Sequence, residues 1–518
     1  MAHCGAHNTR KNHRIKAIIG AAALVFPRCY QRAGIVPSTV AIMVAGWAGV
    51  VVGDLLMETR RALGPRVSSF REMAVAVTGS PWGGVVLDAT VALQSFGTLV
   101  GYVVACGDLV SGSLLRKGLN APDEVYLPMQ ADWRYWLHGA LTESFVAPPA
   151  RILVGLRPLA LICLTCFVFF PLCLLRKLES LRALAASTLV IYAIFLLVLG
   201  KEAIMRVVIG DLGHFTEDDD NGTPQVMPAA PLNWVSGYTN LMRVLPIIAL
   251  SYSCVPLMIE VRRNLEKRVA SQNKVDAAWR IVIIAAFAAS GFFYLCTGFL
   301  GYIAFRGSTS VNVLTNLDNL GPLAMAVNAL FVASLIVSYP LICFVVREPV
   351  RRVVLWCMAL AGLRMAAHNA KKLKSESSVE DAVEESDDHG NNGNSDTDAS
   401  GDDDDDVPVL LFVLEAAIVT GGTLMAAIAV PGIDVVLELI GGTAAVVVSY
   451  IAPVGLFLAV KPARTYEKDR LKAVLIGLSG AFVGVLTCYN LWRSFASHAQ
   501  PASGAAQFQP PKPLPVQQ

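Results

Sequence analysis

Residues 18–34 read I-I-G-A-A-A-L-V-F-P-R-C-Y-Q-R-A-G, an apolar stretch that begins like a membrane helix and is then interrupted by Pro27 and Arg28. A second apolar stretch, residues 241–259, is interrupted at three places, which are Pro246, residues 251–253 (S-Y-S) and Pro256. Unpaired backbone groups are tolerated at membrane depth only where protein or a wet cavity satisfies them. Matched interruptions in the two halves of a chain therefore point to a central binding site between membrane helices.

The composition is that of a membrane protein. Of 518 residues, 54% are hydrophobic and 16% are charged, and the mean hydropathy is +0.54. Soluble domains carry about 25% charged residues. The net charge of +2 gives no reason to expect a nucleic-acid partner. The N-terminus has no secretory cleavage site, so we expect the first span to stay in the mature protein.

The sequence lacks the short motifs of several enzyme classes. There is no G-x-x-x-x-G-K-S/T phosphate loop, no H-E-x-x-H and no G-x-S-x-G. We therefore expect no enzyme, no cofactor, no metal site and no pump driven directly by ATP on this chain.

The apolar stretches predict an all-α integral membrane protein with about 11 transmembrane helices, since a bilayer core needs about 20 apolar residues per helix. The predicted spans are residues 17–35, 37–57, 84–110, 152–175, 183–204, 241–259, 280–304, 321–346, 408–430, 437–460 and 472–492.

The distribution of Lys and Arg predicts the orientation, because these residues accumulate in cytoplasmic loops. Basic residues are concentrated in every second loop, and this alternation predicts a cytoplasmic N-terminus and a C-terminus outside the cytoplasm. The sequon at Asn221 then falls on the side where glycosylation is possible.

Polar segments flank and interrupt the membrane domain, which we place at residues 17–492. A cytoplasmic tail occupies residues 1–16, and a Pro/Gln-rich tail occupies residues 493–518. An acidic insertion at residues 371–406 has almost no large apolar side chains, and we expect it to be disordered in the cytoplasm.

The first interruption is the leading candidate for a ligand site. Small residues in Gly20-Ala21-Ala22-Ala23-Leu24 permit close backbone approach, and Pro27 removes a backbone donor. The N-terminus of a half-helix suits a carboxylate, and freed carbonyl groups suit a cation. The alternative is a proline kink that binds nothing.

Ionisable residues inside spans are further candidates. Arg28 lies beyond the break, and we expect it to form an outer gate with Glu438 or Asp434; the alternative is a side chain that extends to the interface. Candidates for a proton relay are Asp54, Asp88, Asp108 and Glu415.

An ordered series of short patterns resembles the amino acid/auxin permease family, which includes sodium-coupled neutral and vacuolar amino acid transporters. G-A-A-A-L-V-F-P at residues 20–27, followed by A-G, is similar to the family's G-x-G-x-L-x-x-P in the first span. Further matches are S-F-R-E-M-A at 69–74, L-Q-S-F-G at 93–97, L-E-S-L at 178–181, S-Y-P-L at 338–341 and G-G-T at 441–443. The ordered set covers about residues 17–460.

This resemblance implies a leucine-transporter-like fold of 5+5 helices. Repeat one would span residues 17–204, the inverted repeat two would span residues 241–460, and an extra helix would span residues 472–492. It implies secondary active amino acid transport by alternating access, coupled to protons or sodium, in the plasma membrane or a vacuolar or lysosomal membrane. An amino-acid sensor of the same fold is the alternative.

The resemblance also implies where the ligands bind. Substrate contacts would lie at Gly20 to Leu24 and at Ser251, Tyr252, Ser253 and Cys254. If sodium is the coupling ion, Ser338 and Ser334 would supply hydroxyl ligands. The chain departs from the family pattern at Ala22, where a second glycine is usual, and at Arg28, where an aromatic residue is common.

Overall fold

The computed structural model describes residues 21–64, 67, 69–111, 156–175, 179–208, 216–218, 224–226, 231–266, 271–317, 321–360, 409–430, 432–460 and 467–499. Several predicted features lie outside the described residues: Gly20, Asn221, the N-terminal tail, the acidic insertion and the C-terminal tail beyond Ala499.

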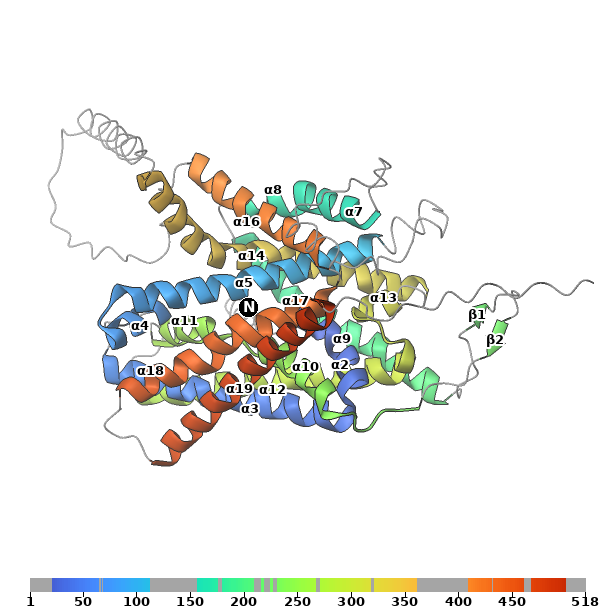
Figure 1. Ribbon diagram of the computed structural model, residues 1–518, viewed down its shortest axis with the longest axis horizontal. Helices are drawn as coiled ribbons and strands as arrows, with labels where there is room; N and C mark the ends of the chain where they lie inside the picture. The colour runs from blue at the N-terminus through green and yellow to red at the C-terminus, as the bar shows by residue number, and fades with distance from the viewer. Residues whose placement is uncertain are drawn as a thin grey trace, which may run out of the picture.

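The described chain is a bundle of long apolar helices, which confirms the all-α integral membrane class. Within the described ranges, nine helices are long and apolar enough to cross a membrane. A tenth, shorter apolar helix spans Ala160–Cys173, and the first span is also helical but broken. A small hairpin, β1 (Thr216–Asp218) and β2 (Pro224–Val226), lies at one end of the bundle (Figure 1).

Each of the 11 predicted spans has a helical counterpart. In the first half these are η1 (Ala21–Val25), α2 (Phe26–Ala33), α3 (Ile35–Leu63), α5 (Pro81–Leu109), α7 (Leu156–Leu164), η4 (Thr165–Phe169), α8 (Phe170–Cys173) and α9 (Glu179–Val208). In the second half they are α10 (Tyr238–Ser251), α11 (Val255–Glu266), α12 (Gln272–Phe305), α14 (Pro322–Leu360), α16 (Val409–Ala429), α17 (Ile433–Ile440), η6 (Gly441–Ala445), η7 (Val447–Ile451), α18 (Ala452–Val460) and α19 (Glu467–Ala499).

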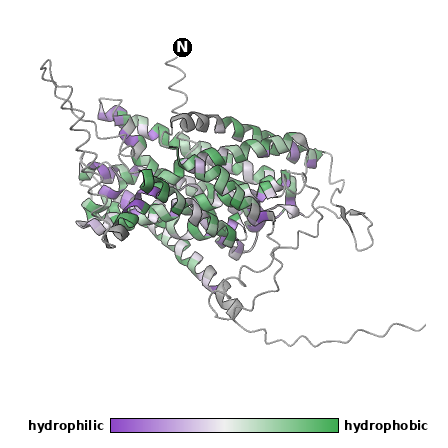
Figure 2. Ribbon diagram, turned by 90° about the horizontal axis from the view of Figure 1, so that it is seen from above, coloured by the Kyte–Doolittle hydropathy of each residue, from purple (hydrophilic) through white to green (hydrophobic). Residues whose placement is uncertain are grey.

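Short helices mark the two ends of the bundle (Figure 1). At the left is α4 (Phe70–Thr78), together with the end of α11; we name this the α4 end. At the right are α2, α13 (Val313–Leu317) and the hairpin; we name this the α2 end. Apolar residues dominate the helices between the ends, and polar residues gather toward them (Figure 2).

The first span is broken as predicted, with Pro27 at the start of the second segment. Residues 21–25 form a 3-10 helix, and the α-helix α2 then begins at Phe26. Pro27 occupies the first turn of α2, where a missing backbone N–H costs nothing. The proline therefore begins a half-helix and does not kink a continuous one.

The second apolar stretch, residues 241–259, is also broken. The sequence suggested three interruptions, and the structure has one. Helix α10 continues through Pro246 and ends at Ser251, and α11 begins at Val255 with Pro256 in its first turn. The break thus consists of residues 252–254, and the expectation of an interruption at Pro246 was wrong.

The tenth span contains two π-helical segments, η6 and η7, between α17 and α18. Segment η6 packs against α10, and a Cβ atom on Gly441 would lie 2.1 Å from the carbonyl oxygen of Pro246. This close approach requires glycine at position 441. Such π-helical turns occur frequently at functional sites.

Candidate functional site

Tyr294 on α12 contacts both breaks. Its ring stacks on Phe26, the residue that follows η1, with centroids 4.7 Å apart, and its hydroxyl donates to the carbonyl of Ser251 at 2.9 Å. The break in α10 deprives this carbonyl of its normal helical partner. The buried side chain of Tyr294 therefore satisfies a free backbone carbonyl at the second break and packs beside the first break.

The first break lies in the centre of the bundle. Segment η1 packs against α5, α10, α12 and α17. Among the predicted contact residues, Ala22, Ala23 and Leu24 are buried, whereas the side chain of Ala21 is not described. The small alanine side chains allow these four helices to approach the segment closely.

Three of the four residues predicted at the second break are buried. Ser251 donates to the carbonyl of Ile247 on its own helix at 2.8 Å. The ring of Tyr252 stacks on Phe287. Its hydroxyl lies close to Gly46 and Gly291, where a Cβ atom would come within 3.3 and 3.0 Å of it. Cys254 is buried.

Among these four described residues, Ser253 is the one for which the structure gives a side-chain hydrogen bond to another element. Its hydroxyl shares a hydrogen bond with the hydroxyl of Ser449 in η7, and its carbonyl accepts from Gln94 Nε2 on α5 at 3.3 Å. Ser253 is half-buried, whereas Gln94 and Ser449 are buried. Three elements therefore meet at this serine.

Sequence reasoning did not single out Gln94 or Ser449. Gln94 lies within the L-Q-S-F-G pattern of the third span, so a polar residue inside an apolar helix was an available signal. Ser449 lies in the π-helical segment η7 of the tenth span. The sequence contains no signal for a π-helical segment at this position.

The predicted sodium ligands lie on α14. Ser334 and Ser338 are both buried, and the Ser338 hydroxyl donates to the carbonyl of Ser334 at 2.5 Å. This hydroxyl keeps oxygen lone pairs that can accept a cation.

At the α2 end, the predicted pair of Arg28 with Glu438 or Asp434 does not form. Arg28 donates to the carbonyl of Thr309 at 3.1 Å and to Gln31. The partner of Asp434 is instead Arg32, with 2.9 Å between Nη2 and Oδ2. Arg32 lies one helical turn after Arg28 on α2, and this offset brings it to the first turn of α17.

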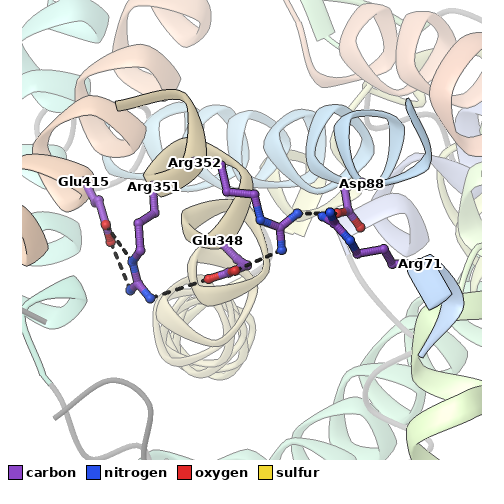
Figure 3. A network of polar contacts seen from close by, with 6 residues as sticks. All are labelled: Arg71, Asp88, Glu348, Arg351, Arg352 and Glu415. Carbon is purple, nitrogen blue, oxygen red and sulfur yellow. Dashed lines mark hydrogen bonds and ion pairs between the residues drawn. The ribbon is translucent and has the colours of Figure 1, made fainter. Parts of the chain in front are cut away.

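Two of the proton-relay candidates belong to an ion-pair network near the α4 end. Glu415, whose side chain is fully buried, accepts two hydrogen bonds from Arg351, at 2.8 and 3.3 Å. Asp88 pairs with both Arg71 and Arg352. Figure 3 shows how Glu348 connects the two halves through Arg351 and Arg352. The network joins α4, α5, α14 and α16, an arrangement that favours a structural role for both carboxylates.

The other two relay candidates also contact arginines. Asp108 at the end of α5 pairs with Arg157 at 2.9 Å, and Asp54 on α3 lies 3.5 Å from Arg280.

Comparison with known proteins gives the family. The sequence model of the family described as "Transmembrane amino acid transporter protein" matches residues 12–491. The chain belongs to this family. The predicted resemblance is thereby confirmed, as is the expectation that the chain is no enzyme, because the family is one of transporters.

Individual relatives are distant. The chain is 26% identical over 341 residues to "Vacuolar amino acid transporter 5" of Schizosaccharomyces pombe, which covers 64% of this chain and 66% of the relative. It is 20% identical over 330 residues to "Sodium-coupled neutral amino acid transporter 7" of Danio rerio, which covers 64% of this chain and 61% of the relative. The matched part of the chain thus spans about three-fifths to two-thirds of these relatives.

Proposed function

We propose that the protein is a secondary active transporter that carries amino acids through the membrane by alternating access. The observation that carries this proposal is the meeting of two broken helices around Tyr294, in a chain that belongs to a transporter family. The substrate binds between the breaks, close to η1 and Ser253.

The helix ends at the breaks suit the two charged groups of an amino acid. Helices α2 and α11 begin there, and a helix N-terminus offers free N–H groups and partial positive charge to a carboxylate. Helix α10 ends there, and its last carbonyl groups suit an ammonium group or a cation. The sequence predicted substrate contacts from Gly20 to Leu24 and from Ser251 to Cys254. Of the residues at the second break, we propose Ser253 as the one that contacts the substrate.

Contacts at the α2 end support a gate. The ion pair of Arg32 with Asp434 joins α2 to α17, and Arg28 joins α2 to the turn at Thr309. We place the α4 end in the cytoplasm, as the positive-inside pattern predicts, so that these contacts close the site from the outer side. Opening of the outer path then requires the Arg32–Asp434 pair to separate.

The coupling ion is a proton or sodium. The buried serines Ser334 and Ser338 are the proposed ligands if the ion is sodium. One relative is named as sodium-coupled, which supports sodium as the ion, and another is named as vacuolar, which supports a vacuolar membrane. We keep the plasma membrane and the lysosomal membrane as the alternatives.

The test is uptake by the purified protein in liposomes, with a panel of labelled amino acids and with the sodium and pH gradients imposed separately. We expect accumulation of at least one amino acid that stops when both gradients are dissipated. Specific binding without accumulation would contradict transport and would support the sensor alternative.

A further inference from the structure

The segment that leads into α10 crosses the corner between α2 and α3. This segment, residues 231–237, is neither helix nor strand, and we name it the strap. Three backbone hydrogen bonds join it to the corner, from the N–H of Ile35 to the carbonyl of Asn233 at 3.0 Å, from Val36 to Trp234 at 3.1 Å and from Ser236 to Ala33 at 3.1 Å. The backbone of the strap is thus held against the corner.

Asn233 and Gly34 fix the strap further. The backbone N–H of Asn233 donates to the hydroxyl of Tyr302 on α12 at 2.8 Å, and its side-chain amide donates to the carbonyl of Gln31 at 3.2 Å. Gly34 forms the corner with a φ of +95°, and a Cβ atom there would lie 2.8 Å from the carbonyl oxygen of Trp234. Only glycine permits both this conformation and this close approach.

The strap lies level with the ends of two membrane spans. One of these spans begins at Ile35, which donates to the strap, and the other begins at Tyr238, which directly follows it. A bilayer that contains both spans therefore places the strap near its boundary with water at the α2 end.

The strap directs large apolar residues outward although its backbone is fixed. Trp234 is 59% exposed, Val235 is 68% exposed, and Tyr238 at the start of α10 is 77% exposed. Residues 231–240 read P-L-N-W-V-S-G-Y-T-N and include no charged residue. Trp and Tyr are enriched at membrane–water interfaces, where their amphipathic rings lie at the level of the lipid headgroups.

This exposed surface continues the lipid-facing side of α3. The exposed apolar residues of α3 have helical spacing and share one face, and they are Val36, Val40, Met43, Val44 and Trp47. An exposed apolar face on a membrane span contacts lipid. Val36 belongs to this face and donates to the carbonyl of Trp234, so the strap is the next surface along it.

We propose that the strap docks in the lipid headgroup interface at the α2 end, with Trp234, Val235 and Tyr238 in contact with lipid. Docking removes the apolar parts of these side chains from water and leaves the indole N–H and the phenol hydroxyl near the headgroups. Because the backbone of the strap is bonded to the corner, docking also holds the junction of α2 and α3 at a fixed depth in the bilayer.

The test is quenching of tryptophan fluorescence in the full-length protein, reconstituted in nanodiscs whose phosphatidylcholine carries bromine on its acyl chains. The difference in emission between wild type and Trp234→Phe reports Trp234. We expect this emission to be lost in lipid brominated close to the headgroup, and to be lost less in lipid brominated at the end of the chain. Val235→Trp, which adds an indole at the neighbouring exposed position, should gain emission that is quenched in the same order.

Trp279→Phe is the matched control, because Trp279 on α12 is 2% exposed and its emission should differ little between the two lipids. Emission from positions 234 and 235 that resists both lipids but is quenched by aqueous iodide would overturn the proposal, because the strap would then face water. Emission that resists all three quenchers would also overturn it, because protein, such as a second copy of this chain, would then cover the strap. The measurement needs no transport, so its outcome is independent of the proposed function.

Discussion

At the scale of single residues, the sequence predicted a break in each of two spans, but it could not predict which side chains meet there. It named residues 251–254, yet among them the structure gives a side-chain hydrogen bond to another element at Ser253, and Ser251 joins α12 through its backbone carbonyl. Successive residues at a helix end point in different directions, about 100° apart along the helix. The partners of Ser253 are also remote, 159 residues away at Gln94 and 196 residues away at Ser449. No local pattern can predict such pairs.

The residues of the proposed gate show the same limit. The sequence singled out Arg28 as the charged residue beside the break, whereas the structure pairs Asp434 with Arg32. Residues four apart lie on the same face of a helix, so the sequence alone could not decide between them. The packing of α2 against the turn at Thr309 engages Arg28 and leaves Arg32 for Asp434.

We predict that exchanging the two charges of the gate recovers transport that each single change removes. Arg32→Asp and Asp434→Arg should each lower the initial rate of uptake about 10-fold or more, because each places like charges together at a partly buried site. The double variant should regain a substantial part of the rate. The control pair is Arg28→Glu with Glu438→Arg. Recovery in the control pair, and none in the Arg32–Asp434 pair, would show that the gate is assigned to the wrong residues.

At the scale of elements, the proline at position 246 does not break α10. The helix continues through the proline, and the π-helical turn of η6 brings Gly441 against its carbonyl. Proline alone is therefore a weak predictor of a break in a membrane helix, where neighbouring groups can satisfy the freed backbone.

Two glycines of the tenth span provide a matched test of this contact. A Cβ at Gly441 would overlap the carbonyl of Pro246 at 2.1 Å, whereas a Cβ at Gly455 would meet nothing within 4 Å. Gly441→Ala should destabilise the protein by about 1–3 kcal/mol. Gly455→Ala should be neutral or slightly stabilising, because alanine favours a helix by up to about 1 kcal/mol. The measurement is the melting temperature of each purified variant, and equal melting temperatures would contradict the close approach of α10 and η6.

A charged cluster joins the ends of α3 and α11 at the α4 end, and Arg262 also pairs there with Asp276 on α12. Arg60 makes two hydrogen bonds to Glu266, at 2.9 and 2.8 Å, and Arg262 makes a third at 2.9 Å. Partial burial alone would raise the pKa of Glu266, but the hydrogen bonds and charges of Arg60 and Arg262 outweigh it, so this pKa lies below its ordinary value.

The sign of this shift predicts how stability depends on pH. A carboxyl group whose pKa is lower in the folded state stabilises the protein above its unfolded pKa, and this contribution is lost as the pH falls through the folded pKa. Glu266→Gln should therefore lower stability at pH 7 by about 1–3 kcal/mol, and the difference from wild type should shrink below about pH 4. Thermal unfolding from pH 3 to pH 8 measures it. A difference that does not vary with pH would mean that the charge of Glu266 contributes nothing.

At the scale of the whole molecule, hydropathy predicted the architecture well, because a continuous membrane helix satisfies its own backbone hydrogen bonds and needs a long apolar run of sequence. Ends were less accurate. Helix α14 continues to residue 360, beyond the predicted end of the span at 346. Its basic residues Arg351 and Arg352 form ion pairs in the network of Figure 3, and these pairs are compatible with a helical backbone there. The inverted relation of the two repeats stays a prediction.

The central claim is that amino acids bind where the two broken helices meet, and the KM for uptake by Ser253→Ala tests it most directly. Thr443→Ala is the control, because its hydroxyl, on the same span as Ser449, donates to its own helix at the carbonyl of Leu439. The account predicts that Ser253→Ala raises the KM of the best substrate about 10-fold and that Thr443→Ala leaves it unchanged. An unchanged KM in Ser253→Ala, in a protein that transports normally, would contradict the account.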